Sequence, residues 1–103
     1  MPRYVSVGRL SDFAPGSILG FKVEGDEVAV VLAEGDFYAF SNSCTPMAAP
    51  LTTGYIAGRE IACLRHDSVF SMESGVAIAG PANESLDIYD VKVEGDEVLI
   101  ARR

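Results

Sequence analysis

The two cysteines of this chain and its single histidine lie in two short segments. There are 18 residues between Cys44 and Cys63, and His66 follows Cys63 after two further residues. Thiolates and an imidazole are the ligands of soft-metal sites and of iron–sulfur clusters. The spacing of Cys63 and His66 allows a tight turn to point both side chains into one concavity. The sequence therefore predicts a metal or iron–sulfur site built from these two segments.

Short apolar and β-branched runs, separated by Gly, Pro, Asn or Asp, predict that a β-sheet scaffold positions these segments. The runs cover residues 27–33, 37–40, 60–63, 68–71, 86–89, 91–93 and 98–101. No segment keeps a helical period. We therefore expect an all-β fold, either a sandwich or a small barrel of antiparallel strands. Four of the aromatic side chains are expected in its core. They are Tyr38, Phe40, Phe70 and Tyr89.

Two stretches of the chain resemble loops rather than strands. Residues 41–56 contain Cys44, two prolines and several small residues, and residues 79–83 contain a Gly-Pro pair. Long loops inside a small domain are usually functional or disordered. Because the first stretch contains Cys44, we expect it to be functional.

One heptapeptide occurs twice, at Lys22–Val28 and Lys92–Val98, and a third Glu-Gly-Asp triplet lies at 34–36. A tandem repeat is one interpretation. Tight hairpins are the preferred one, because glycine readily adopts the positive φ that two-residue Gly-Asp turns require. The expected strand pairs are 17–23 with 27–33, 29–33 with 37–41, and 91–94 with 97–101.

The bulk composition describes one acidic, folded domain. The chain has 103 residues, 49% of them hydrophobic, and a net charge of −7. This sign argues against nucleic acid and anionic membranes as partners. No apolar run has the length of a membrane span or of a secretory signal, so we expect a cytoplasmic protein with reduced thiols. The length predicts a single domain over residues 1–103.

The two cysteine segments resemble the motif of Rieske ferredoxins, in which Cys-x-His is followed by Cys-x-x-His. Cys44, Cys63 and His66 match three of its four ligand positions, whereas Pro46 stands at the first histidine. The likeness extends from Tyr4 to Ile100 and is greatest to the small ferredoxin components of bacterial aromatic-ring dioxygenase systems. Further matching features are Phe37–Phe40, Leu51, Gly54, Phe70, Gly75, Gly80–Ala82 and Leu86–Val93. Two smaller departures are Leu64, where proline is usual, and Asp67, where glycine is usual.

The resemblance implies a Rieske-type antiparallel β-sandwich or barrel, with a cluster-binding loop subdomain over about residues 42–82. It implies a 2Fe–2S cluster bound by Cys44, Cys63 and His66. Proline has no side-chain donor, so a substitute ligand is needed, and Asp67 and Met47 are the candidates, with Ser43 or water as weaker ones. The implied role is one-electron transfer from a ferredoxin reductase to a terminal oxygenase. We expect a monomer that catalyses nothing by itself.

Three other interpretations remain open at the level of sequence. The first is a clusterless Rieske-fold binding or regulatory module, in which Cys44 and Cys63 are close enough to form a disulfide. The second is a zinc or iron site formed by the two thiols, His66 and water. The third is a thiol enzyme with Cys63 as nucleophile and His66 as base, although no orienting Asn or Asp is evident.

Overall fold

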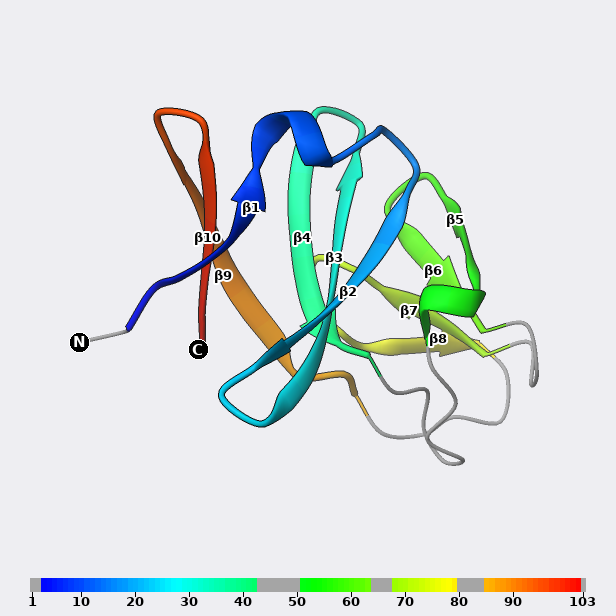
Figure 1. Cartoon of the computed structure of the whole chain (residues 1–103). Helices are drawn as coiled ribbons and strands as arrows, with labels where there is room; N and C mark the ends of the chain where they lie inside the picture. Colours follow the sequence, from blue (N-terminus) through cyan, green and yellow to red (C-terminus); the bar gives the residue numbers. More distant parts are fainter. Residues whose placement is uncertain (1–2, 43–50, 64–67, 80–84, 103) are drawn as a thin grey trace.

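The structure is a computed structural model, and it describes residues 3–42, 51–63, 68–79 and 85–102. Its regular elements within these ranges are almost entirely β-strands, which confirms the all-β prediction (Figure 1). The strands are β1 Val5–Arg9, β2 Ile18–Val23, β3 Asp26–Ala33, β4 Asp36–Ser41, β5 Tyr55–Ala57, β6 Glu60–Ala62, β7 Val69–Ser71, β8 Ala77–Ala79, β9 Ile88–Glu94 and β10 Glu97–Arg102. Two short 3₁₀ helices are η1, Leu10–Asp12, and η2, Leu51–Thr53. Within the described ranges, no helix is long and apolar enough to cross a membrane.

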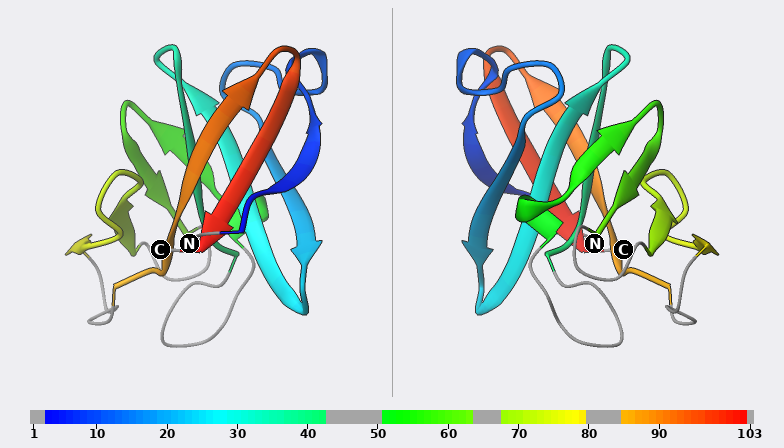
Figure 2. Two further views of the ribbon diagram at one scale, coloured as in Figure 1. Left: turned by 90° about the vertical axis from the view of Figure 1, so that its left-hand side faces the viewer. Right: turned by 90° about the vertical axis from the view of Figure 1, so that its right-hand side faces the viewer.

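The strands form two antiparallel sheets. Six strands make a curled, barrel-like sheet in the order β1-β10-β9-β4-β3-β2. The other four make a smaller sheet in the order β5-β6-β7-β8. Figure 2 shows the smaller sheet lying against one side of the larger one. The fold therefore matches the expected sandwich or barrel, with the smaller sheet inserted in sequence between β4 and β9.

Two sequence-based boundaries are wrong. The runs 86–89 and 91–93 were expected as separate strands, but the structure has one strand, β9, over Ile88–Glu94. The expected loop 41–56 is also too long, because η2 and the start of β5 lie in its last part. Strands as short as β5 contain too few residues for an alternating pattern to be read. The expected loop 79–83 lies largely outside the described residues, apart from Ala79, which ends β8.

The three predicted strand pairs are confirmed, but two of their turns use different residues. β2 pairs with β3 through Val23 opposite Asp26, so the turn is Glu24-Gly25 rather than Gly-Asp. Both turn residues have positive φ, +51° and +89°, as a type I′ turn requires. The turn at 34–35 is of the same kind. Only the turn at 95–96 uses Gly-Asp, with Gly95 at φ +61°.

The core has two parts, and β3 contributes to both. Val28 and Val30 face the inside of the curled sheet, where the apolar residues Val98, Ile100 and Tyr89 pack. The alternate β3 residues face the smaller sheet. This second part contains Ala29, Val31, Ala33, Tyr38, Phe40, Leu51, Ile61, Cys63, Phe70, Met72 and Leu86. The four aromatic side chains expected in the core are all buried, at 9% exposure or less.

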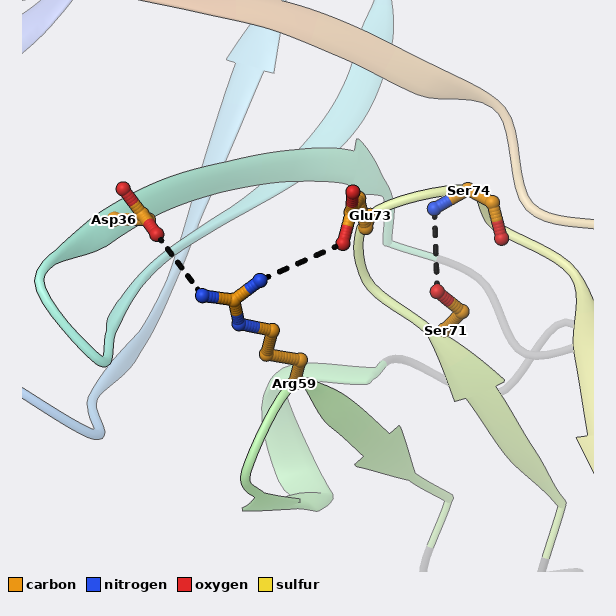
Figure 3. A network of polar contacts seen from close by, with 5 residues as sticks. All are labelled: Asp36, Arg59, Ser71, Glu73 and Ser74. Carbon is orange, nitrogen blue, oxygen red and sulfur yellow. Dashed lines mark hydrogen bonds and ion pairs between the residues drawn. The ribbon is translucent and has the colours of Figure 1, made fainter.

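An exposed ion-pair network also joins the two sheets (Figure 3). The Arg59 guanidinium, in the β5–β6 turn, lies 3.6 Å from an Asp36 carboxylate oxygen on β4. Its other nitrogen lies 3.8 Å from Glu73, in the turn after β7. The Arg59 carbonyl accepts a hydrogen bond from Met72 N–H at 3.0 Å. Arg59 therefore connects β4 of the larger sheet to the turn after β7 in the smaller sheet.

Candidate metal centre

Cys63 lies at the end of β6 and closes the base of segment 64–67. The antiparallel pairing of β6 with β7 continues one step beyond Ala62 and Val69, because Cys63 N–H donates to the Ser68 carbonyl at 2.8 Å. The Cys63 side chain is 2% exposed and belongs to the core between the sheets. Ser68 is completely buried. The segment that contains His66 in the sequence thus starts and ends at two buried, hydrogen-bonded residues.

The other predicted site residues lie outside the described residues. These are Cys44, Pro46, Met47, His66 and Asp67. The structure therefore places one predicted ligand, Cys63, and leaves the meeting of Cys44, Cys63 and His66 a prediction. Within the described ranges, no three His, Cys, Asp or Glu side chains gather as a metal-binding group.

Asn42 joins the two ends of segment 43–50, which contains Cys44 in the sequence. Its backbone N–H donates to the Glu27 carbonyl on β3 at 3.0 Å. Its side-chain Oδ1 accepts the backbone N–H of Thr52 at 3.0 Å. Asn42 was not among the site residues predicted from the sequence. The available signal was an Asn two positions before a candidate ligand, since Asn side chains often bind nearby backbone groups.

The backbone after this segment packs directly against β6. A Cβ atom placed on Gly54 would lie 2.1 Å from the Ala62 carbonyl oxygen. Only glycine allows so close an approach. Tyr55 then pairs with Ala62, the residue before Cys63. The chain that follows segment 43–50, at Gly54 and Tyr55, thus lies next to β6, the strand that precedes Cys63.

Leu86 and Asp87, which follow segment 80–84 in the sequence, are hydrogen-bonded to other parts of the fold, and Asp87 binds the end of β4. Ser41 N–H donates to the Asp87 carbonyl at 2.9 Å, and Asp87 N–H donates to Ser41 Oγ at 3.2 Å. Leu86 N–H donates to the Gly75 carbonyl at 2.8 Å. The adjacent residues Ser41 and Asn42 therefore bind described residues beside two of the three internal segments that the structure does not describe.

Tyr89, on β9, and Arg102, opposite it on β10, are described groups whose pKa values are displaced. Burial raises the pKa of its hydroxyl above 10.0, and the negative charge of Asp26 raises it further. Arg102 opposes this rise through its charge and a hydrogen bond. Arg102 is itself paired with Asp26. Tyr89 is consequently a neutral core residue at physiological pH.

These features describe a class of protein, an all-β domain of two antiparallel sheets with a buried thiol at the end of β6. The comparison with family models makes the class specific, because residues 3–90 match the model described as "Rieske [2Fe-2S] domain". The chain belongs to the Rieske family, as the resemblance predicted. Its cofactor is accordingly a 2Fe–2S cluster. The buried Cys63 thiol fits such a group, because water is excluded from the sulfur and two thiols plus an imidazole are Rieske ligands.

Relatives match almost the whole chain. The ferredoxin component of the naphthalene 1,2-dioxygenase system of Pseudomonas putida is 38% identical, over 95% of this chain and 94% of its own. The ferredoxin of carbazole 1,9a-dioxygenase from Nocardioides aromaticivorans IC177 has a TM-score of 0.91 and 36% identity, covering 100% and 99% of the two chains. A chain in the complex of reduced oxygenase and oxidized ferredoxin in carbazole 1,9a-dioxygenase has a TM-score of 0.90 and 29% identity, covering 97% and 95%.

Proposed function

We propose that this protein is a Rieske-type ferredoxin that carries one electron from a ferredoxin reductase to a terminal oxygenase. The observation that carries the proposal is the buried thiol of Cys63 at the base of a closed segment, in a chain of the Rieske family. Its relatives are ferredoxin components of dioxygenase systems, not catalytic subunits. One of them is a ferredoxin in complex with its oxygenase. The chain therefore acts as a carrier and is not an enzyme by itself.

Cys44 and Cys63 are the proposed thiolate ligands, and His66 is the proposed imidazole ligand. When bound, a 2Fe–2S cluster supplies reversible one-electron chemistry at its irons. The sequence departs from the family motif at Pro46, which has no donor atom. Asp67 or Met47 is the proposed substitute. A carboxylate or thioether in place of an imidazole would change the charge and ligand softness at the cluster.

The competing interpretations receive less support. A clusterless binding module, with or without a Cys44–Cys63 disulfide, is not favoured by relatives that are ferredoxin components along their whole length. A zinc site or a thiol enzyme finds no counterpart among these relatives. The clusterless module stays the alternative for the experiment below, because Pro46 removes one ligand.

The proposal extends to organisation and location. Residues 1–103 would form one Rieske-like domain, with the cluster-binding subdomain over about 42–82. The smaller sheet, β5 to β8, lies within that range and supports this division. The protein would work as a monomer in the cytoplasm, where reducing conditions keep Cys44 and Cys63 available to iron.

The test is a visible absorption spectrum with iron and acid-labile sulfide analysis, on protein purified anaerobically from iron-supplemented cells. We expect about two irons and two sulfides per chain, with charge-transfer bands. Cys63→Ala should lose both, because it removes a thiolate ligand. A wild-type protein that is folded, colourless and free of iron would contradict the proposal.

Pro46→His completes this experiment by restoring the family motif. We expect it to raise iron and sulfide content and to give Rieske-type spectra, because a second imidazole then becomes available to the cluster. If Pro46→His leaves both unchanged, the departure of this site from the family extends beyond one ligand, to Leu64 and Asp67.

A further inference from the structure

Asn42 occupies a junction between the larger sheet and the predicted ligands. Its backbone N–H is fixed to β3 through the Glu27 carbonyl, so the residue continues the larger sheet beyond the end of β4. Its side-chain Oδ1 accepts the N–H of Thr52, which is ten positions further along the chain. One residue therefore determines how far apart the two ends of segment 43–50 lie.

A short path leads from this bond to Cys63. Thr52 belongs to η2, where Gly54 N–H donates to the Leu51 carbonyl at 2.9 Å. The backbone then contacts Ala62 at Gly54 and pairs with it at Tyr55. On the other side, Asn42 is two residues from Cys44 in the sequence. The side-chain amide of Asn42 is thus the polar link between the part of the chain leading to Cys44 and the strand leading to Cys63.

Gly20 on strand β2 leaves room for the hydrogen-bonded side chain of Asn42 and for Thr52. A Cβ atom on Gly20, in β2, would lie 3.2 Å from Thr52 Cγ2 and 3.3 Å from Asn42 Nδ2. Both distances are shorter than an ordinary van der Waals contact between such atoms. Asn42 and Thr52 therefore pack closely against β2 as well as bonding to each other.

We propose that Asn42 is a positioning residue for the cluster ligands, holding the ends of segment 43–50 at the separation at which Cys44 and Cys63 would both bind the cluster. This inference rests on the proposed function, because it takes these two cysteines as ligands. Asn42 is not itself a proposed ligand, and it acts through the backbone that it holds. Removing its side chain should weaken the positioning of the Cys44 and Cys63 thiols more than it lowers the stability of the fold.

The first experiment compares the release of iron to a chelator from three purified holoprotein variants. Asn42→Ala removes the acceptor, whereas Asn42→Asp keeps an oxygen that accepts Thr52 N–H. Asp12→Ala is the matched control, because Asp12 Oδ2 accepts Arg9 N–H at 2.9 Å in η1, at the opposite end of β4 (Figure 1). We expect Asn42→Ala to release iron about tenfold faster than wild type, the usual effect of losing outer-shell support. Its EPR signal should broaden, while the other two variants resemble wild type.

The second experiment needs no cluster. The iron-free chain is equilibrated with reduced and oxidised glutathione, and the Cys44–Cys63 disulfide is quantified. Each bond formed takes two electrons and two protons from the cysteine thiols and converts one glutathione disulfide into two glutathione thiols. The equilibrium constant measures the effective concentration of one thiol at the other. We expect Asn42→Ala to lower it about tenfold and Asp12→Ala to leave it unchanged.

The outcomes separate this inference from the proposed function. A wild-type chain without iron contradicts the function, yet the glutathione experiment still tests the role of Asn42. Equal constants for Asn42→Ala and Asp12→Ala overturn the inference, as does a wild-type chain that forms neither cluster nor disulfide. If Asn42→Ala does not fold, Gly20→Ala displaces the same two side chains and should change both measurements in the same direction.

Discussion

At the scale of single residues, two glycines show where the backbone packs or turns in a way that a larger residue does not tolerate. Gly54 and Gly58 lie on either side of β5, and they are glycines for different reasons. Gly54 has no room for a Cβ atom because of the Ala62 carbonyl, although its φ is not in the left-handed region. Gly58 has open space around it but a φ of +62°. The first is a steric requirement and the second a conformational one.

The two alanine substitutions should therefore differ in cost. Gly54→Ala forces β5 away from β6 and should reduce the free energy of unfolding by about 3 kcal/mol, the upper range for overpacking. Gly58→Ala should cost only about 1 kcal/mol, the penalty of a left-handed conformation for an L-residue. Urea denaturation of the iron-free proteins measures both values. Equal losses would show that the close approach at Gly54 relaxes without cost.

At the scale of elements, identical heptapeptides form different hairpins. In the first copy Val28 lies opposite Phe21, and in the second copy Val98 lies opposite Val93. The loops are accordingly Glu24-Gly25 in one and Gly95-Asp96 in the other. The two registers differ by two residues in the pairing, which keeps every side chain on the same face of the sheet. The alternation of apolar and polar residues cannot distinguish them.

This difference in register predicts different changes in stability for the same Glu→Asn substitution in the two hairpins. Glu24 has φ +51°, a conformation that Asn tolerates better than Glu, so Glu24→Asn should stabilise the protein by about 1 kcal/mol. Glu94→Asn should give no gain, because Glu94 is a paired strand residue. Each substitution removes one exposed ion pair, with Arg3 at 3.5 Å or with Lys92 at 3.3 Å, so that small loss is matched. Urea midpoints that shift equally would refute the assigned registers.

At the scale of the whole molecule, the question is what holds the two sheets together. Figure 3 shows Arg59 between Asp36 and Glu73, but these ion pairs are long and exposed. Exposed pairs contribute little because water and salt screen them. Phe70, by contrast, is completely buried between the sheets. Apolar burial is therefore expected to dominate the attachment of the smaller sheet.

The comparison of Arg59→Met with Phe70→Ala tests this. Arg59→Met keeps the aliphatic stem and the backbone bond to Met72, and it should cost less than about 1 kcal/mol, with the loss shrinking at high salt. Phe70→Ala should cost about 3–5 kcal/mol, the usual range for deleting a buried Phe. Urea unfolding at low and high ionic strength gives both numbers. An Arg59→Met loss as large as that of Phe70→Ala would make the ion pairs the main attachment.

The sequence was sufficient where local chemistry decides the outcome. The types and spacing of Cys44, Cys63 and His66 indicated the family and its cofactor, and short β-branched runs bounded by turn residues indicated the strands. The same patterns found the three-residue strands β6 and β7 but missed the equally short β5 and β8, because a strand of three residues has no readable period and is not detected consistently. They also missed Asn42, whose partner Thr52 is ten positions away.

The sequence by itself determined that the chain is a β protein of the Rieske family, and it predicts a ligand set of two thiols and an imidazole. Only the tertiary structure decided the hairpin registers, the contact of Gly54 with β6 and the bond from Asn42 to Thr52. The physical reason is the same in each case. Alternation fixes the face of a strand on which a side chain lies, whereas register, close approach and long-range hydrogen bonds depend on which other segments pack beside it.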